Sequence, residues 1–494
     1  MIRACALALL LGAAGCAVGP SYEARPAVAP ETKIGTVRPS DSAAAFFDSL
    51  AAARERDTLP AGAEAPPART LSPDTAAHLG WLDLFRDSTM VGLVRTALAQ
   101  NRDLRTAVAR IREFRAEVGV ARAPLFPELS ANGTVSTNQV AIGAFQPTAY
   151  DAFRLTADVA WELDFWGRTR RGIEAARADL ASEEAARRAV VLSLVSDVAT
   201  GYLSLLELDQ ERAIAERTLA SRQATLALAR QRFAQGVTSE LDVRQFEAQV
   251  AVPAATLAQT ERLRAQQEHQ LNLLLGEAPT AVARGGSLVA AVTALTVPDS
   301  IPGALLARRP DVLQAERAYA AATARIGVAQ AARLPTFSIS GSYGTQAPRA
   351  GDLFGSNAEI YQALAGVRLP LFTGGRLVNE TRVAQARAEQ TRSQYEQSVL
   401  IALREASDAL AGVRTARDQV AAQQTQAQAL RRALQLAELR YRTGVSNYLE
   451  VLEAQRSLFD AELALSQAQL RQLSAAVELY RALGGSWDGA EGAR

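Results

Sequence analysis

The stretch R-F-A-Q-G-V-T-S-E-L-D-V, from Arg232 to Val243, is the most informative part of the sequence because the chain contains it a second time. The second copy reads R-Y-R-T-G-V-S-N-Y-L-E-V, from Arg440 to Val451. Five of the twelve positions are identical, and the two copies lie 208 residues apart. In each copy a glycine, which favours the end of a helix, precedes a new apolar pattern. The segment therefore predicts a turn between two helices that the chain uses twice.

An offset of 208 residues aligns much of the remaining chain as well. No insertion is needed over about 180 residues. Three landmark pairs share the offset: Asp103 and Asp311, Gly167 and Gly375, Gly276 and Gly484. Chance does not keep such residues in one frame over that distance, so the chain contains a tandem structural duplication.

The composition of the 494 residues excludes several classes of protein. Lys and Arg number 53, and Asp and Glu number 52, so the formal net charge of +1 gives no general attraction to nucleic acid. His78 and His269 are the only histidines, which leaves neither a His-based catalytic triad nor a His and Cys metal cluster. The sequence therefore predicts neither an enzyme nor a cofactor site.

The N-terminus has the pattern of an export signal over residues 1–15. The apolar run from Ala4 to Leu11 is too short to span a bilayer, and G-A-A-G-C then ends at Cys16. We interpret Cys16 as the acylated first residue of a bacterial lipoprotein; the alternative is an ordinary signal with an incidental cysteine. Residues 16–80 are rich in Pro, Ala and Ser, and we expect an extended arm.

A period of two predicts membrane strands in each copy. Apolar residues occupy every second position from Phe153 to Phe165, and Tyr361 to Leu371 repeats this alternation. Charged residues lie between the apolar positions of the first copy: Arg154, Asp158, Glu162 and Asp164. Such a face favours the wet lumen of a barrel over the alternative, a half-buried soluble sheet. Three aromatic residues at one strand end are predicted to lie at the membrane interface: Trp161, Phe165 and Trp166.

Long helices follow the strands. No proline occurs from Arg168 to Gln235, and apolar residues recur there every seven positions, as in a coiled-coil seam. Such a helix would be about 100 Å long. The patterns divide the chain into a signal (1–15), an arm (16–80), a first repeat (81–275), a connector (276–302), a second repeat (303–484) and a tail (485–494). The helix that opens the first repeat is expected to run unbroken from Trp81 to about Arg122.

These elements imply an assembly. Each repeat supplies two strands, and four strands per chain cannot close a barrel, whereas membrane barrels have no open edges. We therefore predict a mixed α and β membrane protein in which a homotrimer forms a 12-stranded outer membrane β-barrel. This barrel would continue into a long periplasmic α-helical barrel, so the assembly would be a conduit.

The chain resembles the outer membrane factors (TolC/OprM-like) of tripartite efflux systems, and specifically their lipoprotein (NodT-type) branch. The hallmarks are C-A-V-G-P-S-Y from Cys16, L-L-A-R-R-P-D-V from Leu305, L-P-L-F-T-G-G-R from Leu369 and the repeated turn with its continuation to Arg456. The resemblance implies a trimeric exit duct that exports small toxic molecules. It also implies a periplasmic membrane-fusion adaptor and an inner membrane pump, of RND type, as partners, beside the outer membrane lipid around the barrel.

The resemblance also assigns roles to residues. The two turns would be periplasmic tips that dock the adaptor, at Gly236, Val237, Thr238, Gly444, Val445 and Ser446. The periplasmic gate would involve Leu449, Glu450 and Glu453, with Leu241 and Asp242 on the first tip. Three copies of Glu450 and Glu453 at a narrow point would repel one another and attract cations.

Two other functions fit parts of these patterns. A type I secretion exit duct shares the conduit architecture, but the lipoprotein signals disfavour it. A periplasmic coiled-coil adaptor or structural lipoprotein would explain the helices and the anchor. Neither of those last two would explain the paired strands with a charged face.

Overall fold

The computed structural model describes residues 17–23, 33–35, 69–70, 87–140, 148–288, 295–296, 300–443, 445–446 and 448–485. They fall into two compact units. The first comprises the described residues within Met1–Arg25, Val108–Ala186 and Leu313–Ser398. The second comprises those within Pro26–Ala107, Arg187–Val312 and Val399–Arg494. Each unit therefore combines matching pieces of both sequence copies.

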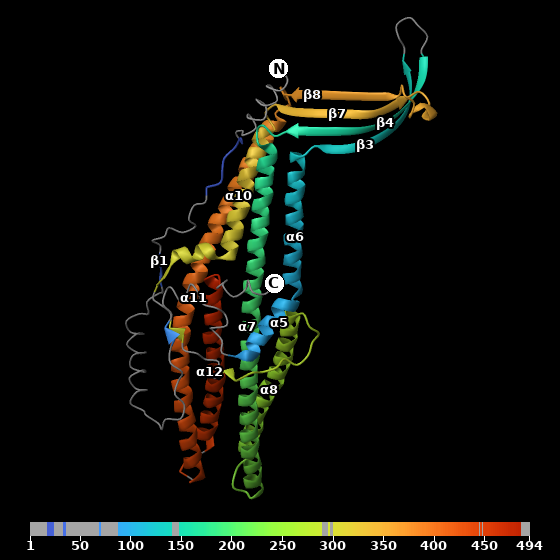
Figure 1. Cartoon of the computed structure of the whole chain (residues 1–494). Helices are drawn as coiled ribbons and strands as arrows, with labels where there is room; N and C mark the ends of the chain where they lie inside the picture. Colours follow the sequence, from blue (N-terminus) through green and yellow to red (C-terminus); the bar gives the residue numbers. More distant parts are fainter. Residues whose placement is uncertain are drawn as a thin grey trace. The chain divides into compact units, whose positions relative to one another are not determined.

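A four-stranded antiparallel sheet forms one end of the first unit (Figure 1). Its order is β3 (Glu128–Val140), β4 (Thr148–Leu163), β7 (Thr336–Ala347) and β8 (Glu359–Arg368). Each repeat contributes one hairpin, and β4 of the first pairs with β7 of the second. The predicted two strands per repeat are confirmed.

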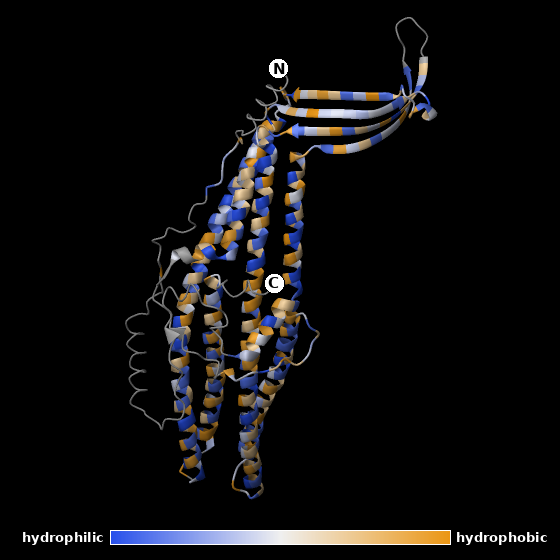
Figure 2. Cartoon of the chain, viewed as in Figure 1, coloured by the Kyte–Doolittle hydropathy of each residue, from blue (hydrophilic) through white to orange (hydrophobic). Residues whose placement is uncertain are grey.

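The register of the strands gives the sheet one apolar and one polar face. Trp161 lies opposite Ile339, which lies opposite Ala365, whereas Asp158 lies opposite Ser342, which lies opposite Gln362. Figure 2 shows the resulting alternation of hydrophobic and hydrophilic residues along the strands. Large apolar side chains of the sheet are exposed, including Leu129 at 76%, Tyr361 at 82% and Val367 at 66%. Exposed apolar area of this extent marks an interaction surface.

The sequence-based strand is two residues too long. β4 ends at Leu163, so Asp164 and Phe165 lie beyond it. The Asp164 carboxylate accepts hydrogen bonds from the backbone N–H groups of Thr169 (3.0 Å) and Arg170 (2.9 Å). It satisfies N–H groups that the first turn of a helix leaves without partners. Asp164 therefore caps the following helix and is not part of the charged strand face.

The helices repeat with the predicted offset. The two long helices are α7 (Arg168–Ala234) and α11 (Arg376–Arg442), each of 67 residues. The helices after the turns are α8 (Glu240–Leu275) and α12 (Tyr448–Ala482). The starts of α7 and α8 plus 208 give the starts of α11 and α12, which confirms the duplication. α7 is apolar and long enough to cross a bilayer by composition, but 56% of its most apolar stretch is buried, as in a packed core helix.

The helix expected from Trp81 to Arg122 is two helices within the described residues, which exclude Trp81. They are α5 (Ser88–Gln100) and α6 (Arg102–Arg122). Asn101 separates them with an extended ψ of 133°. Its side chain accepts from the Leu104 N–H at 3.0 Å and donates to the Leu274 carbonyl at 3.0 Å. The buried amide therefore stabilises the break through a contact that the local sequence does not reveal. The counterpart of α6 in the second repeat is α10 (Pro310–Ala331).

The core of the second unit lies among helices from both repeats. Met90, Tyr202, Leu203, Leu473 and Val477 form one buried cluster. The Tyr202 hydroxyl donates to Asp87 Oδ2 at 2.8 Å and accepts from the Gly285 N–H at 2.9 Å, which ties the connector to the helices. Short strands also join the arm to the connector: β1 (Lys33–Gly35) pairs with β6 (Ser300–Pro302), and β2 (Arg69–Thr70) pairs with β5 (Leu295–Thr296).

Gly276, which ends α8, is predicted to tolerate no side chain. Its φ is +75°, and a Cβ there would lie 2.7 Å from the Gln100 carbonyl oxygen. We expect Gly276→Ala to lower the free energy of unfolding by more than about 2 kcal/mol. An alanine would be strained in the left-handed conformation, and its Cβ would clash with the backbone of Gln100, so both effects destabilise the folded state. Thermal unfolding of the purified protein, followed by loss of helical circular dichroism, measures the effect. Gly286→Ala is the control, since no atom lies within 4 Å of its Cβ position; an equal loss in both variants would contradict the argument.

Candidate functional site

The first repeated turn lies between α7 and α8 in the second unit. Gly236 has a φ of +74°, and the Val237 N–H donates to the Arg232 carbonyl at 3.0 Å, so the glycine ends α7 as predicted. Val237 and Leu241 are 71% and 66% exposed. Two apolar side chains on an otherwise polar turn present a small surface to a partner.

The second turn, between α11 and α12, repeats this geometry. The Val445 N–H donates to the Arg440 carbonyl at 2.9 Å. Val445 is 68% exposed and Leu449 is 55% exposed, while Ser446 is partly buried. Gly444, predicted as the helix stop here, lies outside the described residues. The two tips thus offer similar apolar contacts.

The acidic residues of the two tips differ in their bonding. The Asp242 carboxylate accepts from Thr238 Oγ1 at 2.8 Å and from the Ser239 N–H at 3.1 Å, and the Asp242 N–H donates to Ser239 Oγ, which completes a capping box. Hydrogen bonds from Thr238 and Ser239 hold the pKa of Asp242 below its ordinary value. Asp242 and Thr238 therefore stabilise the first turn of α8.

Glu450 and Glu453 on the second tip are held more loosely. Glu450 pairs with Arg440 at 3.3 Å and Glu453 with Arg456 at 2.9 Å. All four side chains are about half or more exposed. Exposed ion pairs contribute little free energy, so neither pair holds its carboxylate firmly. Both carboxylates are accessible to ions in solution.

An aromatic cluster, which sequence reasoning missed, joins the two hairpins near their tips. Phe246 of α8 packs on Tyr448 of α12 with ring centroids 3.9 Å apart, and Tyr448 lies 5.3 Å from Tyr441. Arg232 of α7 donates to the Tyr441 hydroxyl at 2.6 Å and lies over its ring. The sequence does contain one indication of this cluster, since Tyr441 and Tyr448 flank the second turn and lie seven residues apart. The cluster couples the position of one tip to that of the other.

The three predicted interface aromatics gather where β4 ends in the first unit. Trp161 Nε1 donates to the Leu125 carbonyl at 3.1 Å, and Trp166 Nε1 donates to the Pro335 carbonyl at 2.7 Å. Phe165 packs edge-to-face on Phe337 with ring centroids 4.8 Å apart. Aromatic rings with one satisfied polar atom are typical of a membrane interface. That role stays a prediction.

The segment that follows Cys16 docks beside these aromatics. The Val18 N–H donates to the Trp166 carbonyl at 3.0 Å, and the Arg171 guanidinium donates to the carbonyl oxygens of Val18 and Gly19. Gly19 is required, because a Cβ there would lie 2.4 Å from the Gly327 Cα. Cys16 itself lies outside the described residues. Its neighbours in the chain are nevertheless held against the strand end.

A buried carboxyl on α7 is the most perturbed acid of the second unit. Glu207 is 5% exposed. Burial, and then the nearby Glu211 carboxylate, raise the pKa of Glu207 to about 8. A carboxyl with a raised pKa remains protonated at neutral pH and is costly to ionise.

Stability should therefore depend on pH through Glu207. The native pKa exceeds the unfolded value of 4.5, so the protein loses stability as pH rises from about 4.5 to about 8. Glu207→Gln removes this loss, and we expect it to raise the free energy of unfolding at pH 8 by at least about 1 kcal/mol but not at pH 4.5. Thermal unfolding at both pH values tests this, with the exposed Glu261→Gln as control. The same gain at both pH values would contradict it.

Within the described ranges, no group of three or more His, Cys, Asp or Glu side chains is placed to hold a metal ion. The side chains described above offer charge, apolar surface and hydrogen bonds to a partner. Such groups suit passage and docking.

Comparisons with known proteins agree with the duplicated architecture. The family model described as "Outer membrane efflux protein" matches twice, at residues 93–277 and 301–485, which are offset by 208 residues. The toluene efflux pump outer membrane protein TtgC of Pseudomonas putida is 36% identical over 417 residues, covering 83% of this chain and 86% of the relative. The cation efflux system protein CusC of Escherichia coli is 32% identical, covering 84% of this chain and 90% of the relative.

Solved structures show the same fold. The outer-membrane channel OprN superposes with a TM-score of 0.81 at 30% identity, covering 96% of this chain and all of that one. CusC superposes with a TM-score of 0.78 at 30% identity, covering 86% and 99%. These matches confirm the predicted family and the mixed fold of long helices and a four-stranded sheet. The chain therefore belongs to the outer membrane efflux protein family, whose members are the non-enzymatic outer membrane channels of efflux pumps.

Proposed function

We propose that this channel is a homotrimer whose twelve strands close a barrel in the outer membrane. The sheet carries this proposal: its apolar side chains are exposed, and β3 and β8 each pair on one edge only among the described strands. A sheet in lipid has no open edges, since unpaired backbone groups there cost several kcal/mol each. Joining β8 of one chain to β3 of the next removes every edge, and three chains give a barrel wide enough for a channel.

Mass and conductance test the trimer together. The purified protein should have the mass of three chains after correction for bound detergent. It should also form discrete single channels in a planar bilayer. A stable single-chain mass with no channels would overturn the trimer.

The chain is proposed to belong to the lipoprotein branch, with acylated Cys16 as the mature N-terminus. The docked segment supports this, because Val18 is bonded to Trp166 at the strand end predicted to lie at the interface. An acyl chain two residues earlier would enter the lipid beside the barrel. One chain contributes about 0.8 kcal/mol for each buried CH₂.

Radioactive palmitate labelling in cells checks the anchor. We expect Cys16→Ala to abolish labelling completely, because it removes the acylated thiol. Cys5→Ala should leave labelling intact, since Cys5 lies within the signal. Label retained in Cys16→Ala, or lost in Cys5→Ala alone, would contradict the assignment.

The two tips are proposed to dock a periplasmic membrane-fusion adaptor that connects the channel to an RND-type inner membrane pump. The exposed Val237 and Val445 are the contact candidates, and Leu449, Glu450 and Glu453 are proposed to line the closed gate. Relatives are named for efflux of antibiotics, toluene or cations. By similarity we propose that this duct exports small toxic molecules. Photo-crosslinking from Val237 and Val445 should capture one adaptor; capture of none from either position would overturn the docking role.

A further inference from the structure

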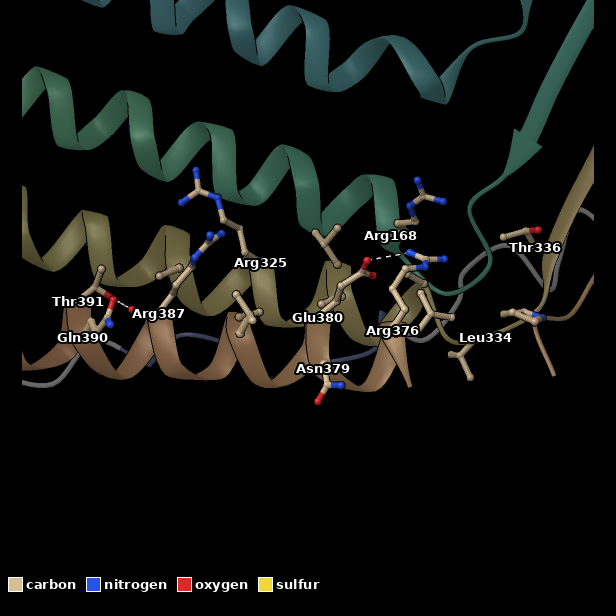
Figure 3. A pocket seen from close by; sticks show the side chains of 18 of the residues that line it. Arg168, Arg325, Leu334, Thr336, Arg376, Asn379, Glu380, Arg387, Gln390 and Thr391 are labelled. Carbon is tan, nitrogen blue, oxygen red and sulfur yellow. Dashed lines mark hydrogen bonds and ion pairs between the residues drawn. The ribbon is translucent and has the colours of Figure 1, made fainter. Parts of the chain in front are cut away.

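A large open cavity lies in the first unit. Its volume is about 1230 Å³, more than the upper end of the usual small-molecule pocket range, about 1,000 Å³. The walls come from the end of β4, the start of α7, α10 and α11, with the β7 and β8 ends that adjoin them. Figure 3 shows side chains from α7, α10 and α11 converging on it. The cavity is therefore built by both repeats.

Its charge is strongly positive. Five arginines line it: Arg168, Arg325, Arg368, Arg376 and Arg387. Only two carboxylates do, Glu162 and Glu380. Arg168 pairs with Glu162 at 3.4 Å, Arg376 pairs with Glu380 at 2.7 Å, and Arg325 pairs with Asp179 outside the lining.

Arg368 and Arg387 make no side-chain ion pair or hydrogen bond with any residue of the described chain. Figure 3 shows Arg387 of α11 and Arg325 of α10 extending toward the same part of the cavity. Two guanidinium groups side by side repel each other unless an anion lies between them. Arg387 has no partner in the described chain and Arg325 has only the Asp179 carboxylate, so an anion between these two guanidinium groups would relieve their repulsion.

The strand register shows which side of the sheet the cavity adjoins. Glu162 lies opposite Ser338, and Thr336 lies opposite Arg368. These residues alternate with Trp161, Phe337 and Val367, so they belong to the polar face. In the proposed barrel the apolar face contacts lipid, so the cavity opens to the lumen and not to the membrane.

The walls between the arginines are apolar. Val328, Ala329 and Leu334 of the α10 end and Val383 of α11 line the cavity. An apolar wall beside a guanidinium suits a molecule with an apolar body and one anionic group. The planar fork of arginine matches the oxygens of a carboxylate or sulfonate with two parallel hydrogen bonds.

We propose that this cavity is a lumenal binding site for amphiphilic organic anions, with Arg387 and the neighbouring Arg325 as the anion contacts. The lumenal position rests on the proposed trimeric channel; the binding site itself does not. Three copies in the trimer place three such sites around the passage. Exported anions would pause there before they leave through the barrel.

Binding of naphthalene-2-sulfonate to the full-length trimer in detergent, measured by equilibrium dialysis, tests the site. We expect Arg325→Gln with Arg387→Gln to raise the Kd at least about tenfold, because both charged hydrogen-bond donors to the sulfonate are removed. Arg387→Lys keeps the charge but loses the fork and should give an intermediate Kd. Arg392→Gln is the matched control, since Arg392 lies on α11 outside the cavity lining and pairs with Glu396, which also lies outside it.

Two further probes identify the ligand chemistry. Neutral 2-naphthalenemethanol should bind weakly and equally to all variants. Inorganic phosphate should compete poorly, because it makes no apolar contact; strong competition would identify a simple phosphate site and overturn the amphiphilic assignment. An unchanged Kd for naphthalene-2-sulfonate in the double variant would overturn the site itself.

Block of single-channel current by the same sulfonate separates this site from the channel. Binding lost in the double variant without any conductance in the wild type would support the site and refute the channel. Normal conductance of the wild type, together with a Kd that the double variant leaves unchanged, would support the channel and refute the site. Block that weakens in parallel with binding supports the lumenal position.

Discussion

Replacing Arg309 with alanine should lower the free energy of unfolding by about 2–3 kcal/mol, because its charged hydrogen bonds are lost while its two carboxylate partners are partly exposed. The side chain is 6% exposed in the second unit and donates to Asp311 at 2.7 Å, Glu405 at 2.6 Å and the Ala482 carbonyl at 2.9 Å. Burial lowers the pKa of Arg309, but hydrogen bonds to Asp311 and Glu405 outweigh it and raise the pKa overall. Its removal leaves Glu405 and the end of α12 without their buried partner.

The duplication supplies the matched control for this variant. Asn101 stands 208 residues before Arg309 and donates to the Leu274 carbonyl, the counterpart of Ala482. Asn101→Ala removes neutral hydrogen bonds only and should cost about 1–2 kcal/mol. Thermal unfolding of both purified variants compares the losses. Equal losses would show that the ion pairs of Arg309 contribute nothing beyond the cap.

Replacing Glu450 and Glu453 with glutamine should remove or reverse the cation preference of single channels. In the proposed gate three copies of each carboxylate surround a narrow passage, where they attract cations and repel one another. Arg440 and Arg456 now compensate part of that charge. Their charges remain in the double variant, so the passage becomes positive and should favour anions.

The reversal potential of single channels under a salt gradient measures this change. The control is Glu240→Gln with Glu247→Gln, which removes two carboxylates from the first hairpin, both paired with Arg244. It should shift the potential far less, because we expect the second tip to form the main gate. Equal shifts in both double variants would assign the selectivity to both tips. No shift in either double variant would show that the gate does not lie at these tips.

Some elements were predictable because their cause is local. The seven-residue apolar spacing and the absence of proline predict the helices that the structure places at Arg168–Ala234 and Arg376–Arg442. Gly236 ends its helix because a left-handed residue is needed there, and glycine adopts that conformation without strain. The strands were predictable from their period of two.

Other features depended on contacts between distant residues. Asp164 continues the strand alternation in sequence, yet it caps α7 because the chain turns directly after Leu163. Asn101 divides two helices because the Leu274 carbonyl, 173 residues away, accepts its amide. Both are residue types that often cap helices, but the apolar periods around them continue without a break and conceal that role.

The duplication, the two-faced strands, the long helices and the family could all be inferred from the amino-acid sequence, since each is a period or a motif repeated along the chain. Which polar groups meet became evident only in the folded molecule. The aromatic cluster of Phe246, Tyr441 and Tyr448 and the arginine-lined cavity both join residues of the two repeats. Periodicity specifies the face of a helix or strand on which a side chain lies. The neighbour that the side chain meets depends on how separate elements pack against one another, and the period of the sequence carries no information about that packing.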